Sequence, residues 1–152
     1  MSSGSILAVF LCCAGAELAW ETVLTLINMR HVSAHAGEAP SFYAELWARR
    51  KQPPPEGHLA RSAAYTLARS RLSLAAQALS SLLVVALVWS GALGALERLL
   101  AAALPGAALS GVAFVLCVGL LLHLAGIPFG LYSQFVIEER FGFNTMKPGL
   151  WV

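Results

Sequence analysis

A long stretch without charge constrains this chain more than any other feature. No aspartate, glutamate, lysine or arginine occurs between Arg98 and Glu138. Two further apolar runs precede this stretch, over residues 5–28 and 72–96. A helix rises about 1.5 Å per residue, so each run is long enough to cross a hydrocarbon core of about 30 Å. The sequence therefore predicts an all-α integral membrane protein, a helical bundle with about three transmembrane helices in contact with the lipid bilayer.

Composition and local signals refine these spans. Charged residues make up 12% of the chain, whereas soluble domains contain about a quarter. The first run lacks a basic leader and carries Glu17 and Glu21, which favours a membrane helix over a signal peptide. "LPG" at residues 104–106 predicts a turn, so the third span is expected over residues 107–137. "GIP" at residues 126–128 predicts a kink in this span, because proline lacks a backbone donor.

The positive charges predict the orientation. The segment between the first two spans contains Arg30, Arg49, Arg50, Lys51, Arg61, Arg69 and Arg71, and the next connection contains only Arg98. By the positive-inside rule, the loop over residues 29–71 is cytoplasmic, the N-terminus is outside, and the C-terminus is cytoplasmic. Within the loop, "PSFYAELWARRK" has apolar residues at helical spacing and predicts a short amphipathic helix. The chain from His58 is expected to continue as one helix into the second span.

Three ionisable residues lie within the predicted spans. Glu17 and Glu21 are four residues apart and share a helix face, and His123 lies in the third span. An ionisable side chain inside a membrane span is a candidate functional residue. Hydrogen bonding to a neighbouring helix, or a position among the lipid headgroups, is the plainer interpretation.

A pair of histidines raises the question of a metal site. His31 and His35 are four residues apart, and such a pair can bind zinc from one face of a helix. A metalloprotease helix needs HExxH, but Val32 follows His31, and no HExxH occurs in the 152 residues. We therefore predict no catalytic residue, no metal ligand and no cofactor in this chain. The basic loop also lacks the charge density of a nucleic-acid-binding protein, so nucleic acid is not an expected partner.

The segment after the third run carries a specific resemblance. "PFGLYSQFVIEERFGFNTMKP" resembles a signature in the N-terminal membrane region of integral-membrane zinc metalloproteases that include the type 1 CAAX prenyl proteases. The matching positions are Pro128, Phe129, Tyr132, Phe135, Ile137, Glu138, Glu139, Arg140, Phe141, Gly142, Phe143, Asn144 and Thr145. "AAYTLARSRL", with Tyr65 and Arg71, is similar to the family's cytoplasmic entry into its second helix.

This resemblance implies the function of a zinc metalloprotease family. The chain, however, lacks the HExxH motif that this function requires. The full-length family binds zinc and cleaves prenylated CAAX-type C-termini. We therefore expect the N-terminal transmembrane domain of such a metalloendopeptidase, catalytically incompetent alone; whether the chain takes part in an enzyme stays open. A natural truncation, a gene fragment and a stand-alone domain would all have this sequence. The alternative is a small membrane scaffold or assembly protein that binds partners through its cytoplasmic loop and its "EERFGFN" head.

The resemblance also implies a role for the head, defined as residues 138–144. We expect it to dock on another surface, because Phe141 and Phe143 would otherwise leave large apolar areas in water. The expected surface is a catalytic metalloprotease part, a second copy of the chain, or the chain's own cytoplasmic loop. An ordinary helix end with interfacial charges is the alternative. The candidate docking residues are Glu138, Glu139, Arg140, Phe141, Gly142, Phe143 and Asn144.

Overall fold

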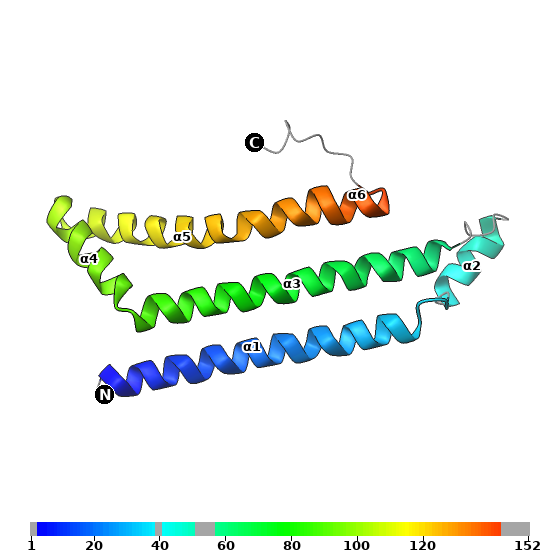
Figure 1. The fold of residues 1–152 in the computed structure, drawn as a ribbon, viewed down its shortest axis with the longest axis horizontal. Helices are drawn as coiled ribbons and strands as arrows, with labels where there is room; N and C mark the ends of the chain where they lie inside the picture. The colour runs from blue at the N-terminus through cyan, green and yellow to red at the C-terminus, as the bar shows by residue number, and fades with distance from the viewer. Residues whose placement is uncertain (1–2, 39–40, 51–56, 144–152) are drawn as a thin grey trace. The chain divides into compact units, whose positions relative to one another are not determined.

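The computed structural model describes residues 3–38, 41–50 and 57–143, and every regular element in these ranges is helical (Figure 1). The elements are α1 (Ser3–Ala34), α2 (Ser41–Arg50), α3 (His58–Trp89), α4 (Ala92–Ala103), α5 (Ala107–Tyr132), η1 (Ser133–Ile137) and α6 (Glu138–Phe141). Three continuous helices in the described part are long and apolar enough to cross a membrane: Gly4–Ala34, His58–Trp89 and Ala107–Phe141. The predicted all-α membrane fold is therefore confirmed.

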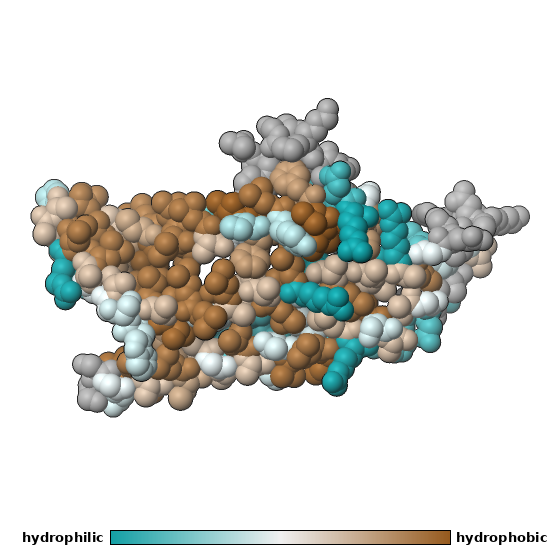
Figure 2. Space-filling model, viewed as in Figure 1, coloured by the Kyte–Doolittle hydropathy of each residue, from teal (hydrophilic) through white to brown (hydrophobic). Residues whose placement is uncertain are grey.

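The helices expose apolar side chains in the way that lipid-facing helices do. Among the described residues, Ile137 is the one buried hydrophobic side chain, at 6% exposure. Large side chains such as Trp20, Trp89 and Val115 are more than half exposed. Figure 2 shows apolar side chains gathered along the exposed surface of α5. In water such a surface would be strongly unfavourable, whereas in a bilayer lipid tails cover it.

The chain divides into two compact units. The first contains Met1–Trp20 and Ala75–Gly130, and the second contains Glu21–Leu74 and Leu131–Val152. Within the first unit, segments of α1, α3 and α5 together line one cavity. Within the second unit, α3 contacts the end of α1 and also α6. Each unit is thus built from helical segments that are distant in sequence.

The second apolar run does not form one helix to Leu96. Helix α3 ends at Trp89, and Gly91 takes a left-handed conformation with φ of 73° before α4 begins. Ser90 supports this break, since its hydroxyl oxygen lies 3.4 Å from the amide nitrogen of Ala92. Helix α4 was not predicted from the sequence, because its residues are as apolar as those of the span before it.

The third long helix contains a π turn after its proline. Pro128 lies inside α5, and the helix continues past it to Tyr132. The π turn η1 follows at Ser133–Ile137, where the amide of Glu138 donates to the carbonyl of Ser133. A π turn adds one residue to the helical repeat, so it rotates the side chains beyond it by about 100° relative to an uninterrupted α-helix. The irregularity in hydrogen bonding thus lies directly before the head.

Candidate functional site

The last turn of the third long helix ends in a complete C-terminal cap. Gly142 has φ of 72° and follows α6 directly. Its amide donates to the carbonyl of Glu139 at 3.0 Å, and the amide of Phe143 donates to the carbonyl of Glu138 at 2.8 Å. This pair of bonds is the Schellman pattern, which satisfies carbonyls that a helix end otherwise leaves without donors.

An arginine from α3 completes this cap. The Nη2 atom of Arg61 donates a hydrogen bond to the carbonyl oxygen of Phe141, 80 positions along the chain. A cation at this place is favourable, because the C-terminal end of a helix carries partial negative charge. A Cβ atom at position 142 would lie 2.7 Å from Arg61 Nη2. Glycine at position 142 therefore permits both the left-handed turn and the close approach of the guanidinium.

Tyr65 lies one helical turn after Arg61 and contacts both phenylalanines of the head. Its ring centroid is 5.6 Å from that of Phe141 and 4.9 Å from that of Phe143, with interplanar angles of 74° and 64°. Edge-to-face pairs of this kind contribute about 0.5–1.5 kcal/mol each beyond area burial. The two pairs fix the rings of the head against α3.

Two more arginines surround these rings. Arg69 Nη1 donates to the hydroxyl of Tyr65 at 2.9 Å, and the Arg140 guanidinium lies 5.9 Å from the Phe141 ring centroid. Arg61, Tyr65 and Arg69 are spaced by four residues and therefore share one face of α3. We call the set Arg61, Tyr65, Arg69, Phe141 and Phe143 the α3–α6 junction.

The junction leaves an apolar surface uncovered on the same C-terminal turns. Phe143 is 49% exposed although it contacts Tyr65, and Tyr132 and Val136 are 52% and 44% exposed. Ile137, by contrast, is buried. We call Tyr132, Val136 and Phe143 the outer residues. They lie at the end of the long helix, beside the exposed charged residues Glu139 and Arg140.

The structure places the predicted head residues as follows. Glu138 and Phe141 are half-buried, and Glu139, Arg140, Gly142 and Phe143 are exposed. Asn144 lies outside the described residues. Arg61 and Arg69 were not predicted from the sequence as residues of this site. The spacing of four residues between Arg61, Tyr65 and Arg69 was a signal that they share one face of α3. Both arginines were used only to predict the orientation of the chain in the membrane.

The predicted intramembrane residues do not form one site. Glu17 lines a cavity of about 360 Å³ in the first unit, together with the polar side chains of Gln77, Ser80 and Ser81 on α3. Glu21 belongs to the second unit, and His123 is exposed on α5. The structure thus brings Glu17 together with neutral polar groups of α3, and neither Glu21 nor His123 lines this cavity.

The two histidines stack on each other near the end of α1. Their ring centroids are 4.4 Å apart. His35 Nδ1 lies 2.9 Å from the carbonyl oxygen of His31, and Nε2 lies 3.9 Å from a carboxylate oxygen of Glu38. The backbone contact thus occupies one of the two ring nitrogens of His35. Within the described residues, no three histidine, cysteine or acidic side chains are arranged to hold a metal ion.

Comparison with known protein families gives a match over most of the chain. Residues 28–152 match the CAAX prenyl protease N-terminal family, which is described as having five membrane helices. This match includes all of α2 to α6 and therefore both sides of the α3–α6 junction. No curated protein and no solved structure matches the chain. The match confirms the resemblance that the "EERFGFN" segment indicated.

Proposed function

The chain belongs to the CAAX prenyl protease N-terminal family, and we propose that it is the membrane platform on which a zinc-dependent catalytic part docks. The observation that carries this proposal is the α3–α6 junction. One residue of α3 caps the head and another holds its aromatic rings, so the head has a defined position. A docking surface benefits from such rigidity, because ordering a mobile segment on binding lowers the affinity.

The outer residues are the surface that we assign to the partner. Tyr132, Val136 and Phe143 remain about half exposed after the head has packed on α3. Burying a large apolar side chain stabilises a complex by roughly 1.5–3 kcal/mol when it was fully exposed before. Half-exposed side chains should give about half of this each. The neighbouring Glu139 and Arg140 provide charges of both signs for matching a polar rim.

The chemistry itself would come from the partner. A catalytic zinc site in a protein usually has three protein ligands and a water, and a nearby base activates this water. The 152 residues contain no HExxH to supply these groups. We therefore infer that the chain alone is catalytically incompetent. Proteolysis of prenylated C-termini and zinc binding are inferred from the family and assigned to the catalytic part.

The proposed orientation brings the platform to the cytoplasmic side. The second unit contains the basic loop and the head, and the positive-inside rule assigns both to the cytoplasm. Helix α2 in this loop has Tyr43 and Trp47 with ring centroids 5.7 Å apart. Aromatic residues of this kind favour the membrane–water interface. A partner that docks on the outer residues would thus lie next to the cytoplasmic membrane surface.

Binding to a catalytic part tests this proposal. The full chain is reconstituted in nanodiscs and mixed with a separately purified HExxH-containing segment of the same family, and co-elution is measured. We expect the parent chain to bind the segment. Phe143→Ala should bind about three- to tenfold more weakly, because it lacks the half-exposed ring that the partner would bury. Phe10→Ala is the matched control, because Phe10 belongs to the other unit.

The outcomes separate the competing functions. Cleavage of a prenylated CAAX peptide by the mixture, and not by the chain alone, would support the platform directly. Equal binding by the parent chain and Phe143→Ala would contradict the assigned surface. Self-association without binding of the catalytic segment, abolished by Phe143→Ala, would instead identify a second copy as the occupant of the head.

A further inference from the structure

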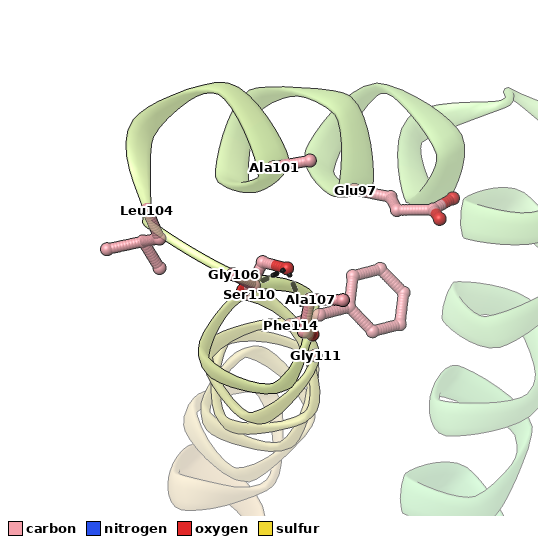
Figure 3. A pocket seen from close by; sticks show the side chains of 8 residues that line it. All are labelled: Glu97, Ala101, Leu104, Gly106, Ala107, Ser110, Gly111 and Phe114. Carbon is pink, nitrogen blue, oxygen red and sulfur yellow. Dashed lines mark hydrogen bonds between the residues drawn. The ribbon is translucent and has the colours of Figure 1, made fainter.

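A pocket in the first unit lies at the turn between α4 and α5, away from the head in sequence. Its volume is about 520 Å³, and its lining includes Glu97 and Ala101 of α4, Leu104 of the turn, and Ser110, Gly111 and Phe114 of α5. In Figure 3 the carboxylate of Glu97 and the ring of Phe114 extend toward the same side of the pocket from the two helices. The volume lies within the range of small-molecule sites.

The polar groups of this pocket are acceptors. No hydrogen bond or ion pair joins the Glu97 carboxylate to another side chain in the described part of the chain. The Ser110 hydroxyl donates to backbone carbonyls, with the Ala107 oxygen at 3.2 Å, so its oxygen remains available as an acceptor. Phe114 adds an aromatic face, which attracts cations. A carboxylate, a hydroxyl oxygen and an aromatic ring together favour an ammonium group.

A positive feature lies beside these acceptors. The first turn of α5 begins at the pocket, and the amide groups at a helix start favour an anion. Arg98 follows Glu97 on α4, does not line the pocket, and is exposed. The surroundings therefore offer positive charge next to the acceptor set. A ligand that carries an ammonium and a phosphate close together would match both.

The position of the pocket indicates a lipid as the source of these groups. Ala107, where α5 begins, is also the first residue of the third candidate membrane span. A span that begins at this residue would place the pocket in the headgroup region. Leu99, Leu109 and Val112 on the same two helices are 64%, 49% and 58% exposed. These side chains provide an apolar surface for acyl chains below the headgroup.

We propose that the α4–α5 pocket binds the headgroup of a phosphatidylethanolamine molecule. The ammonium group lies at Glu97, Ser110 and Phe114, and the phosphate lies toward the start of α5. This lipid fits better than phosphatidylglycerol, whose headgroup has no cation to place at the carboxylate of Glu97. The site is independent of the α3–α6 junction, so its test does not depend on a catalytic partner.

Lipid binding to the intact chain tests the proposal. The full chain is purified in detergent and titrated with phosphatidylethanolamine or phosphatidylglycerol of identical acyl chains, and bound lipid is counted by native mass spectrometry. We expect phosphatidylethanolamine to bind the parent chain about fivefold more tightly at one site, the size of one partly exposed ion pair. Glu97→Gln keeps the shape of the side chain and should remove this preference. Glu45→Gln on α2 is the matched control and should retain it.

Further measurements keep the result interpretable. Circular dichroism and size-exclusion chromatography should show Glu97→Gln folded like the parent chain. Phe114→Leu should weaken the preference about two- to threefold, because it removes the aromatic face and retains apolar volume. A headgroup preference that survives in Glu97→Gln would overturn the proposal. Binding of dodecylamine at a Glu97-dependent site without any preference for phosphatidylethanolamine would also overturn it, since the ligand would then be a free amine.

Discussion

Replacing Gly142 by alanine should open the cap of the head. Gly142 has φ of 72°, a conformation that alanine adopts only at a cost, and a methyl group there would lie 2.7 Å from Arg61 Nη2. The substitution therefore strains the backbone and displaces the guanidinium that caps the Phe141 carbonyl. Neither effect changes the apolar residues of the membrane span, so insertion should be unaffected.

The size of the effect follows from these two terms. A non-glycine residue in the left-handed region costs about 1–2 kcal/mol. A charge-assisted hydrogen bond contributes about 1.5–3 kcal/mol when buried. Arg61 is exposed and its side chain can move, so we assign about 0.5–1 kcal/mol to this bond. The sum is about 1.5–3 kcal/mol, which corresponds to a roughly 10- to 150-fold larger population of the open cap.

Hydrogen exchange measures this population. The amides of Gly142 and Phe143 donate within the cap, so their exchange requires it to open. In Gly142→Ala the exchange protection of a peptide that covers these two amides should fall 10- to 150-fold. If the free energy of cap opening in the parent chain is smaller than this loss, the protection should disappear completely. Gly142→Asn should recover part of the loss, because asparagine tolerates the left-handed region better.

A matched glycine substitution serves as the control. Gly130 lies inside α5, and a Cβ atom there meets nothing within 4 Å. Gly130→Ala should therefore leave the cap unchanged and stabilise the helix by about 0.5–1 kcal/mol. Unchanged protection of the Gly142 and Phe143 amides in Gly142→Ala would refute the assigned roles of the left-handed turn and of Arg61.

Two further predictions concern topology and metal. In a chain whose native cysteines are replaced by alanine, Ser3→Cys should react with an impermeant thiol reagent on intact cells and Arg49→Cys should not; the reverse pattern would overturn the proposed orientation. The purified chain should contain no stoichiometric zinc and cleave no prenylated peptide, because HExxH is absent. Metal analysis near one zinc per chain, lost in His31→Ala or His35→Ala, would show that the histidine pair binds metal.

The sequence was informative about the fold where one physical requirement dominates. Membrane helices must be long and apolar, so the three runs identify the three candidate spans. Residues 90–96 were assigned wrongly to the second helix for the same reason, because hydropathy does not distinguish α4 from the span before it. The signal for the break was Gly91, but glycine is common in membrane helices and therefore marks a break poorly.

The α3–α6 junction shows a second limit of sequence patterns. The helix end at Gly142 can be predicted locally, because a glycine after charged residues is typical of a helix C-terminus. The residue that caps this helix end cannot be predicted locally, because Arg61 is 80 positions away and helical periodicity describes only neighbours on one helix. The π turn at Ser133–Ile137 adds to this difficulty. It rotates the side chains of the head by about 100°, the angle of one residue. A prediction based on an uninterrupted α-helix would therefore place the wrong side chains against α3.

The two sides of the junction explain each other's composition. The positive-inside rule predicts basic residues near this end of α3, but it does not distinguish Arg61 and Arg69 from other basic residues there. The spacing of four residues on either side of Tyr65 places Arg61 at the Phe141 carbonyl and Arg69 at the Tyr65 hydroxyl. The head in turn needs aromatic rings on both sides of a glycine, so that the turn can bring both against one tyrosine. "FGF" and the Arg61–Tyr65–Arg69 face of α3 are therefore best understood as two halves of one packing unit.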